Sequence, residues 1–146
     1  MVIRVLDDER ANICDNLLTK LIQDERQYDK SIDKGFVVKD YFKNVIKNEE
    51  NILLCYEENN IIKGYIYLKQ IINNNKKGYL IDGLYVEELY RNKSIASKLI
   101  EKALNITKDN GIEVLEINVM SQNKKAIKLY KKYGFNEFKI CFRKKD

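Results

Sequence analysis

The stretch YLIDGLYVEELYRNKSIASKLI (Tyr79–Ile100) decides the fold. Its first half is apolar and aromatic, which is typical of a buried strand. Its second half repeats apolar residues at helical spacing, which predicts a helix. A period-two strand pattern, IEVLEINV (Ile112–Val119), comes next. The segment therefore predicts a β–α–β unit whose parallel strands are joined by a right-handed crossover.

The same criteria divide the rest of the chain into short elements. We expect a strand at 2–6, helices at about 14–28 and 38–46, strands at 51–57 and 61–70, a helix at 126–133 and a last strand at Phe135–Arg143. Asn59 and Asn60 suit a tight hairpin turn. The expected order is β-α-α-β-β-β-α-β-α-β. It predicts one α/β domain over residues 1–146, with a mixed sheet of about six strands and helices on both faces.

Composition narrows the function. The 146 residues carry a net charge of +5, but the lysines are spread among acidic residues, so nucleic-acid binding is the weakest of the functions considered. There is no histidine, and the three cysteines lack metal-ligand spacing, so we expect no metal site. No run is apolar enough for a signal peptide or a membrane span. These features predict a reduced, cytoplasmic protein.

The turn at Arg91–Ala96 lies where a strand gives way to a helix. Ligands of mixed and parallel sheets bind at such carboxyl ends, and free N–H groups at a helix start attract phosphate. The turn contains no glycine, which usually lets phosphate approach the backbone. The alternative is a surface helix with Asn92 and Ser94 as caps. These residues alone leave both readings open.

Two motifs in the second half of the chain resemble those of the GCN5-related N-acetyltransferase (GNAT) superfamily. The first, Arg91-Asn92-Lys93-Ser94-Ile95-Ala96, is similar to the family's pyrophosphate loop, with Ser94 in place of the first glycine. The second is NVMSQNKKAIKLYKKYGF (Asn118–Phe135), in which Asn123, Ala126, Tyr130, Gly134 and Phe135 match. The resemblance implies a GNAT fold and transfer of acetyl from acetyl-CoA to a primary amine, by direct attack in a ternary complex.

The resemblance also implies a cofactor site. The backbone of Leu84, Tyr85 and Val86 would hydrogen-bond the pantetheine arm. The pyrophosphate would lie on the turn formed by Arg91, Asn92, Lys93, Ser94, Ile95 and Ala96. Asn123 and Ala126 would complete the site, although Asn123 could equally cap its own helix. Because Ser94 replaces the first glycine of the loop, the protein could be a member of the superfamily that binds acetyl-CoA poorly. The alternative function is a non-catalytic CoA-binding sensor.

Acetyl transfer needs a base for the amine and an acid for the leaving thiolate. The resemblance assigns the acid to Tyr130, which could otherwise be one more aromatic in a helical stripe. Asp82 is our first candidate base because a carboxylate within a strand is unusual unless it faces a cleft. Glu116, on the neighbouring strand, is the second.

The acceptor region of this superfamily corresponds here to the first two helices and the third and fourth strands. In this chain that region offers Glu25, Tyr28, Asp29 and Tyr67, with Tyr65 beside them. Acidic and aromatic groups suit a cationic amine, either a small molecule or a protein amino group. The same residues could also be an exposed helix end. The last strand could pair with a second copy, which would make a homodimer.

Overall fold

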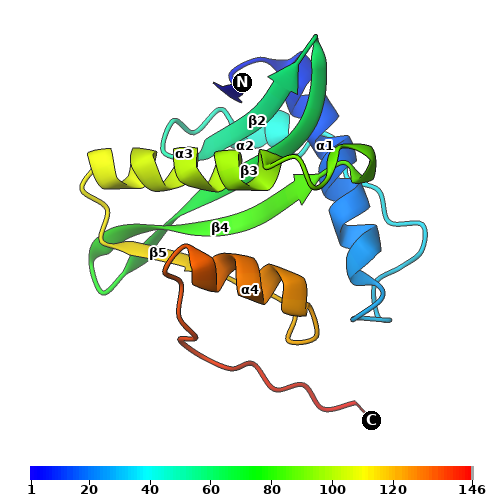
Figure 1. Cartoon of the computed structure of the whole chain (residues 1–146), viewed down its shortest axis with the longest axis vertical. Coiled ribbons are helices and arrows are strands. Elements are labelled where there is room, and N and C mark those ends of the chain that lie inside the picture. Colours follow the sequence, from blue (N-terminus) through cyan, green and yellow to red (C-terminus); the bar gives the residue numbers. More distant parts are fainter. Residues whose placement is uncertain (146) are drawn as a thin grey trace.

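The computed structural model describes residues 1–145 and contains one five-stranded sheet with helices on both faces (Figure 1). The strand order is β1-β2-β3-β4-β5, with β5 parallel to β4 and the other pairs antiparallel. The elements are β1 (Val2–Arg4), α1 (Asp8–Glu25), α2 (Phe42–Val45), β2 (Ile52–Glu58), β3 (Ile61–Asn73), β4 (Lys76–Val86), the 3-10 turn η1 (Glu88–Tyr90), α3 (Ile95–Asp109), β5 (Val114–Ile117) and α4 (Lys124–Lys132). The predicted α/β class and parallel β–α–β unit are confirmed.

Two apolar cores sandwich the sheet. On one face, α3 packs through Ile95, Leu99, Ile100 and Ala103, and α4 contributes partly buried residues. On the other face, the core contains residues of α1 and α2. The strands supply both cores because successive side chains point to opposite faces. Burial on both faces explains why β2 and β3 are almost continuously apolar.

Two asparagine turns close the antiparallel part of the sheet. Asn59 and Asn60 have φ of 54° and 62°, and Asn74 and Asn75 have φ of 52° and 65°. Two consecutive left-handed residues define the turn whose twist matches that of a hairpin, and asparagine tolerates this conformation well. The hairpin predicted at Asn59–Asn60 is confirmed.

The second helix is shorter than predicted. The pattern indicated a helix from about Val38, whereas α2 covers only Phe42–Val45. Asp40 has φ of 56°, which interrupts a right-handed helix, and the Val38 N–H bonds instead to the Thr19 hydroxyl at 3.0 Å. The buried Asp15 carboxylate accepts the Phe42 N–H at 3.0 Å, and this bond anchors α2 to α1.

The predicted sixth strand at Phe135–Arg143 is wrong. Within residues 1–145 this segment pairs with no strand, and in Figure 1 the red chain after α4 runs away from the sheet. Phe138, Ile140 and Phe142 are between 73% and 90% exposed. Their alternation with polar residues satisfies the strand pattern, but a strand also needs a partner edge. The end of the segment is held instead by an ion pair between Arg143 and Asp29 at 2.9 Å.

A close approach within the sheet makes Gly83 necessary. A Cβ added at Gly83 would lie 2.5 Å from the Tyr65 hydroxyl oxygen. That hydroxyl is fully buried and has no hydrogen-bond partner among residues 1–145. Gly83 therefore provides the room that the Tyr65 ring occupies beneath α1.

We expect Gly83→Ala to destabilise the protein by about 1–3 kcal/mol, the range for overpacking a core. Tyr65→Phe should be close to neutral because it removes a buried hydroxyl that has no partner. The double variant should then lose less than the sum of the two, since the closest clash is gone. Urea denaturation of the four proteins measures this, and strictly additive losses would contradict the proposed clash.

Candidate functional site

One extra residue in β4 opens the sheet. Tyr67 pairs with Gly83 and Leu68 pairs with Ile81, so Asp82 between them has no partner on β3. This is a β-bulge, which bends the strand and re-aims the side chain. On the other edge of β4, pairing with β5 ends at Ile81. Beyond the bulge, β4 therefore has one edge without a strand partner.

The residues predicted to hold the cofactor arm lie on this half-free part of β4. Leu84, Tyr85 and Val86 pair with β3 on one side only. In a strand with one free edge, alternate N–H and C=O groups remain available to an extended ligand, which can add as a further strand. The Val86 carbonyl accepts a bond from Arg91 Nε at 2.9 Å. The geometry suits an extended amide-containing chain.

The start of α3 is uncapped. Ser94 occupies the N-cap position, but its side chain makes no capping hydrogen bond. The N–H groups of the first turn have no partner within a helix, so their partial positive charge faces outward. Ser94 has φ of 65° and Asn92 has φ of 64°. The serine thus adopts the left-handed conformation that glycine adopts without strain. The alternative in which Asn92 and Ser94 merely cap a surface helix is not what the structure shows for Ser94.

Arg91 is committed to partners within the chain. Besides the Val86 carbonyl, its guanidinium reaches Asp24 of α1 at 3.4 Å and lies over the Tyr85 ring at 5.2 Å. These contacts fix the loop relative to β4 and α1. Lys93 is exposed beside the start of α3, and Ile95 is buried in the core while Ala96 is half-buried. Arg91 orients the turn, and Lys93 is its exposed cation.

Asn123 begins α4 and acts as its cap. Its side-chain oxygen accepts the Ala126 N–H at 3.2 Å. Sequence reasoning left capping and cofactor binding as equal alternatives, and the structure shows the cap. One turn after Ala126, the Tyr130 ring packs edge-on against Phe135, with ring centroids 6.2 Å apart. Burial, and to a lesser degree the negative charge of Glu25, raises the pKa of Tyr130 to about 12.

A cavity of about 540 Å³ lies between α1, the segment before α2 and the bulge in β4. Glu25 and Asp82 both line it, and Tyr41 lies beside them. Burial raises the pKa of the Glu25 carboxyl, and the nearby charges of Asp29 and Asp82 raise it further. Burial also raises the pKa of Asp82, although this side chain remains open to the cavity and Lys69 acts in the opposite direction. Two carboxylates thus share one partly desolvated space.

The other predicted site residues lie elsewhere. Glu116 lies on β5, where it pairs with Leu80 of β4, and it does not line the cavity. Tyr28 also lies outside it, and Asp29 is bound by Ser31 and Arg143, which holds its pKa at about 2. Tyr67 is buried with its ring edge-on to Tyr41. Of the four predicted acceptor residues, Glu25 alone lines this cavity.

Sequence reasoning missed the apolar part of the cavity and Tyr41. The pattern predicts a helix from about Val38, and it gives no reason to place this segment beside a cavity. Asp40 carried the signal that could have corrected this, because aspartate is one of the few residues that adopts a positive φ readily. Its effect could not be distinguished from an ordinary helix start by pattern alone.

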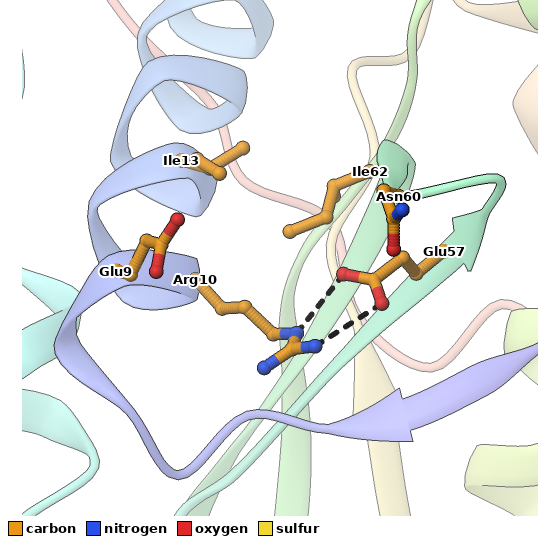
Figure 2. Close-up of a pocket in the computed structure, with 6 residues that line it drawn as sticks. All are labelled: Glu9, Arg10, Ile13, Glu57, Asn60 and Ile62. Carbon is orange, nitrogen blue, oxygen red and sulfur yellow. Dashed lines mark hydrogen bonds and ion pairs between the residues drawn. The ribbon is translucent and has the colours of Figure 1, made fainter.

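A second cavity of about 260 Å³ lies at the other end of α1 (Figure 2). Its lining residues are Glu9, Arg10, Ile13, Glu57, Asn60 and Ile62. Arg10 and Glu57 point at each other across it and form two hydrogen bonds, at 3.0 and 3.1 Å. Because these charges satisfy each other, the cavity offers little to a ligand. Within residues 1–145 there is also no group of three metal-ligating side chains, and no helix long and apolar enough to cross a membrane.

Comparison with known proteins agrees with this geometry. The chain is 31% identical over 103 residues to an uncharacterized N-acetyltransferase of Methanocaldococcus jannaschii, covering 68% of this chain and 46% of that protein. It therefore spans about half the length of this curated relative. The fold matches the BH1408 protein of Bacillus halodurans with a TM-score of 0.82 at 18% identity, covering 99% of both chains.

An aminoglycoside N-acetyltransferase in complex with CoA shares the fold at a TM-score of 0.75 and 11% identity, over 100% of this chain and 99% of the other. At these identities the solved structures establish the fold alone. A family model described as "Acetyltransferase (GNAT) family" matches residues 16–135. This range includes the second half of α1, the bulge in β4, the start of α3 and Tyr130. The chain belongs to the GNAT acetyltransferase family.

Proposed function

We propose that the protein is an acetyl-CoA-dependent N-acetyltransferase whose acceptor is a primary amine. The observation that carries the proposal is the convergence of three features at one point of the sheet. These are the half-free edge of β4, the uncapped start of α3 and the cavity that contains Glu25 and Asp82. Acetyl-CoA supplies an acetyl group activated as a thioester.

The residues fit that cofactor in two places. The edge of β4 at Leu84–Val86 offers backbone groups to the amide-containing arm, as a strand does to an added strand. The N–H groups at the start of α3, with Lys93 beside them, offer positive charge to the pyrophosphate. Arg91 acts by holding this turn against β4 rather than as its outermost cation.

Asp82 is the proposed base. An alkyl amine has a pKa near that of lysine, about 10.4, and is mostly protonated at neutral pH. Asp82 would take that proton, directly or through water, as the amine nitrogen bonds to the acetyl carbon. Its raised pKa improves its match to this task, since a base works best when its pKa approaches the working pH. Glu25 would hold the incoming ammonium group.

Tyr130 is the proposed acid. As the carbon–sulfur bond breaks, the phenol would donate its proton to the departing thiolate. The pKa of about 12 keeps the hydroxyl protonated at neutral pH, so it is always available as a donor. Such a weak acid can transfer its proton only in concert with bond breaking, because an ordinary thiol has a lower pKa, about 8.5.

A non-catalytic CoA-binding sensor would share the cofactor features but has no need of the cavity. The presence of two partly desolvated carboxylates next to the half-free strand edge favours the enzyme. Release of thiol from acetyl-CoA in the presence of an amine distinguishes the two functions.

We expect Lys93→Glu to weaken acetyl-CoA binding about tenfold or more, since it replaces attraction to phosphate by repulsion. Lys102→Glu makes the same change of charge two turns along α3 and should alter the affinity less than twofold. Calorimetric titration of acetyl-CoA into the three proteins measures this. Equal losses in both variants would mean that overall charge, not the turn, attracts the ligand.

Tyr130→Phe should lower kcat about 100-fold, the lower range for loss of a general acid, with little change in acetyl-CoA affinity. Tyr133→Phe is the matched control, because it changes the same residue type on the adjoining turn and removes only a hydroxyl bonded to Glu101 at 3.2 Å. Initial rates of thiol release measure both variants. A Tyr130→Phe enzyme as fast as the control would exclude the phenol as the acid.

Asp82→Asn should lower kcat about 100-fold or more at neutral pH. In the native enzyme, kcat/KM should fall as the pH drops through the raised pKa of Asp82, because the protonated carboxyl cannot accept a proton. A native profile that stays flat through the acid range would contradict this role.

The same substitution should stabilise the fold at pH 7. A carboxyl whose pKa is raised on folding favours the folded state while protonated, and this contribution is lost as the pH rises through the folded pKa. Asp82→Asn should therefore unfold at a higher temperature than the native protein at pH 7. The difference should shrink below the unfolded pKa of aspartate, about 3.9. Thermal unfolding across this pH range measures it.

A further inference from the structure

The wall of the acceptor cavity is apolar. Beyond Glu25, Asp82, Tyr41 and Lys39, every side chain lining it is aliphatic or aromatic: Leu18, Leu21, Ile22, Phe36, Val37 and Val38. The first three come from one face of α1 at helical spacing, and the others from the segment before α2. A volume of about 540 Å³ lies within the usual range for small-molecule sites.

This wall is fixed in place by α1. Gln23 donates hydrogen bonds to the carbonyls of Asp33 and Phe36, at 3.2 and 2.9 Å. Arg26 donates to the Ile32 carbonyl at 3.0 Å, and the Thr19 hydroxyl accepts the Val38 N–H at 3.0 Å. Two side chains of α1 and that of its C-cap residue, Arg26, hold the segment. Phe36 and Val37 therefore line the cavity and are not buried in a core. They remain 46% and 55% exposed.

The charge in the cavity is negative near β4. No ion pair joins Glu25 or Asp82 to a basic residue within the described chain. The charge of Lys69 lowers the pKa of Asp82, and Lys39 lines the cavity without pairing with either carboxylate. Burial raises the pKa of both carboxyls, which means that their charge is partly desolvated and that no paired cation offsets this loss. A bound ammonium group would supply that cation.

A polyhydroxylated acceptor fits this wall poorly. Its hydroxyl groups would lie against aliphatic carbons that offer no hydrogen-bond partners, and each unpaired hydroxyl costs about tenfold in binding. An apolar body gains instead, by about three- to fourfold for each buried methylene group. The acidic end of the cavity therefore favours a cationic group, and the apolar wall favours a hydrocarbon body at the other end of the same small molecule.

We propose that the acceptor is a primary amine carried on an apolar body, of the alkylamine or arylalkylamine class. Its ammonium group lies between Glu25 and Asp82, and its carbon chain lies against Leu21, Ile22 and Val37. The inference rests on the proposed acetyl transfer and adds the class of acceptor.

The test is acetylation of an amine series by the protein at saturating acetyl-CoA, with the rate measured as thiol release. For ethylamine, butylamine, hexylamine and 2-phenylethylamine, kcat/KM should rise about three- to fourfold per added methylene until the cavity is full. Cyclohexylamine and glucosamine form a matched ring pair, and cyclohexylamine should be preferred at least tenfold. The glucosamine amine is the less basic of the two, so more of it is neutral, which biases this comparison against the proposal.

Two variants of one wall residue provide the structural control. Val37→Ser should flatten the chain-length dependence, and Val37→Ile should keep or steepen it. Val37 is exposed on a loop, so neither substitution should threaten folding.

The outcomes distinguish a wrong acceptor class from a wrong proposal of acetyl transfer. Thiol release that is indifferent to chain length, or a preference for glucosamine or kanamycin, would overturn the acceptor class and leave acetyl transfer standing. An unchanged chain-length dependence in Val37→Ser would overturn the proposed wall. Failure to release thiol with any amine, short or long, apolar or hydroxylated, would overturn the proposed function itself and this inference with it.

Discussion

The whole site depends on one unpaired residue in a strand. Asp82 is the extra residue of the bulge in β4, and the same point marks the end of pairing between β4 and β5. The bulge directs the Asp82 carboxylate toward the cavity on the α1 face of the sheet. The next four residues of β4 have one edge without a strand partner. Gly83 follows at once because Tyr65 occupies the space in which any other side chain would stand. The irregularity, the opening and the carboxylate are thus one structural event.

Several features in and around the site lower the stability of the folded state. The carboxyls of Glu25 and Asp82 are held in surroundings that disfavour their charge. Tyr65 buries a hydroxyl that has no hydrogen-bond partner in the described part of the chain. Ser94 adopts a conformation that costs a non-glycine residue about 1–2 kcal/mol. Two apolar cores on either side of the sheet carry these costs. Local unfavourable features gathered near one cleft are typical of sites that bind and react, where the surrounding fold determines the strain.

Much of this architecture was predictable from local patterns. The alternation in β5, the helical repeat from Ile95 and the asparagine pair at 59–60 each specify their element with little help from the rest of the chain. The sixth strand failed because a strand is a property of two segments, and Phe138, Ile140 and Phe142 carry the pattern without a partner edge. For the site, a carboxylate within an apolar strand predicted that Asp82 faces a cleft, and Asp82 lines the cavity. The apolar wall was not predictable, because Val37 and Leu21 meet only through bonds between α1 and a loop, and no spacing encodes them.

The segment Phe135–Arg143, which pairs with no strand within residues 1–145, affects how the protein disperses in solution. Protein chains associate through extended segments with exposed apolar side chains and through free sheet edges. Within residues 1–145 this segment exposes three apolar side chains, and the outer edge of β5 has no strand partner. Lys139 separates two of those apolar side chains, and the net charge of +5 makes separate copies repel each other. That repulsion is screened over about 10 Å at 0.1 M ionic strength. Salt concentration therefore sets how freely the molecules disperse, and the basic residues of this segment act as its solubilising charges.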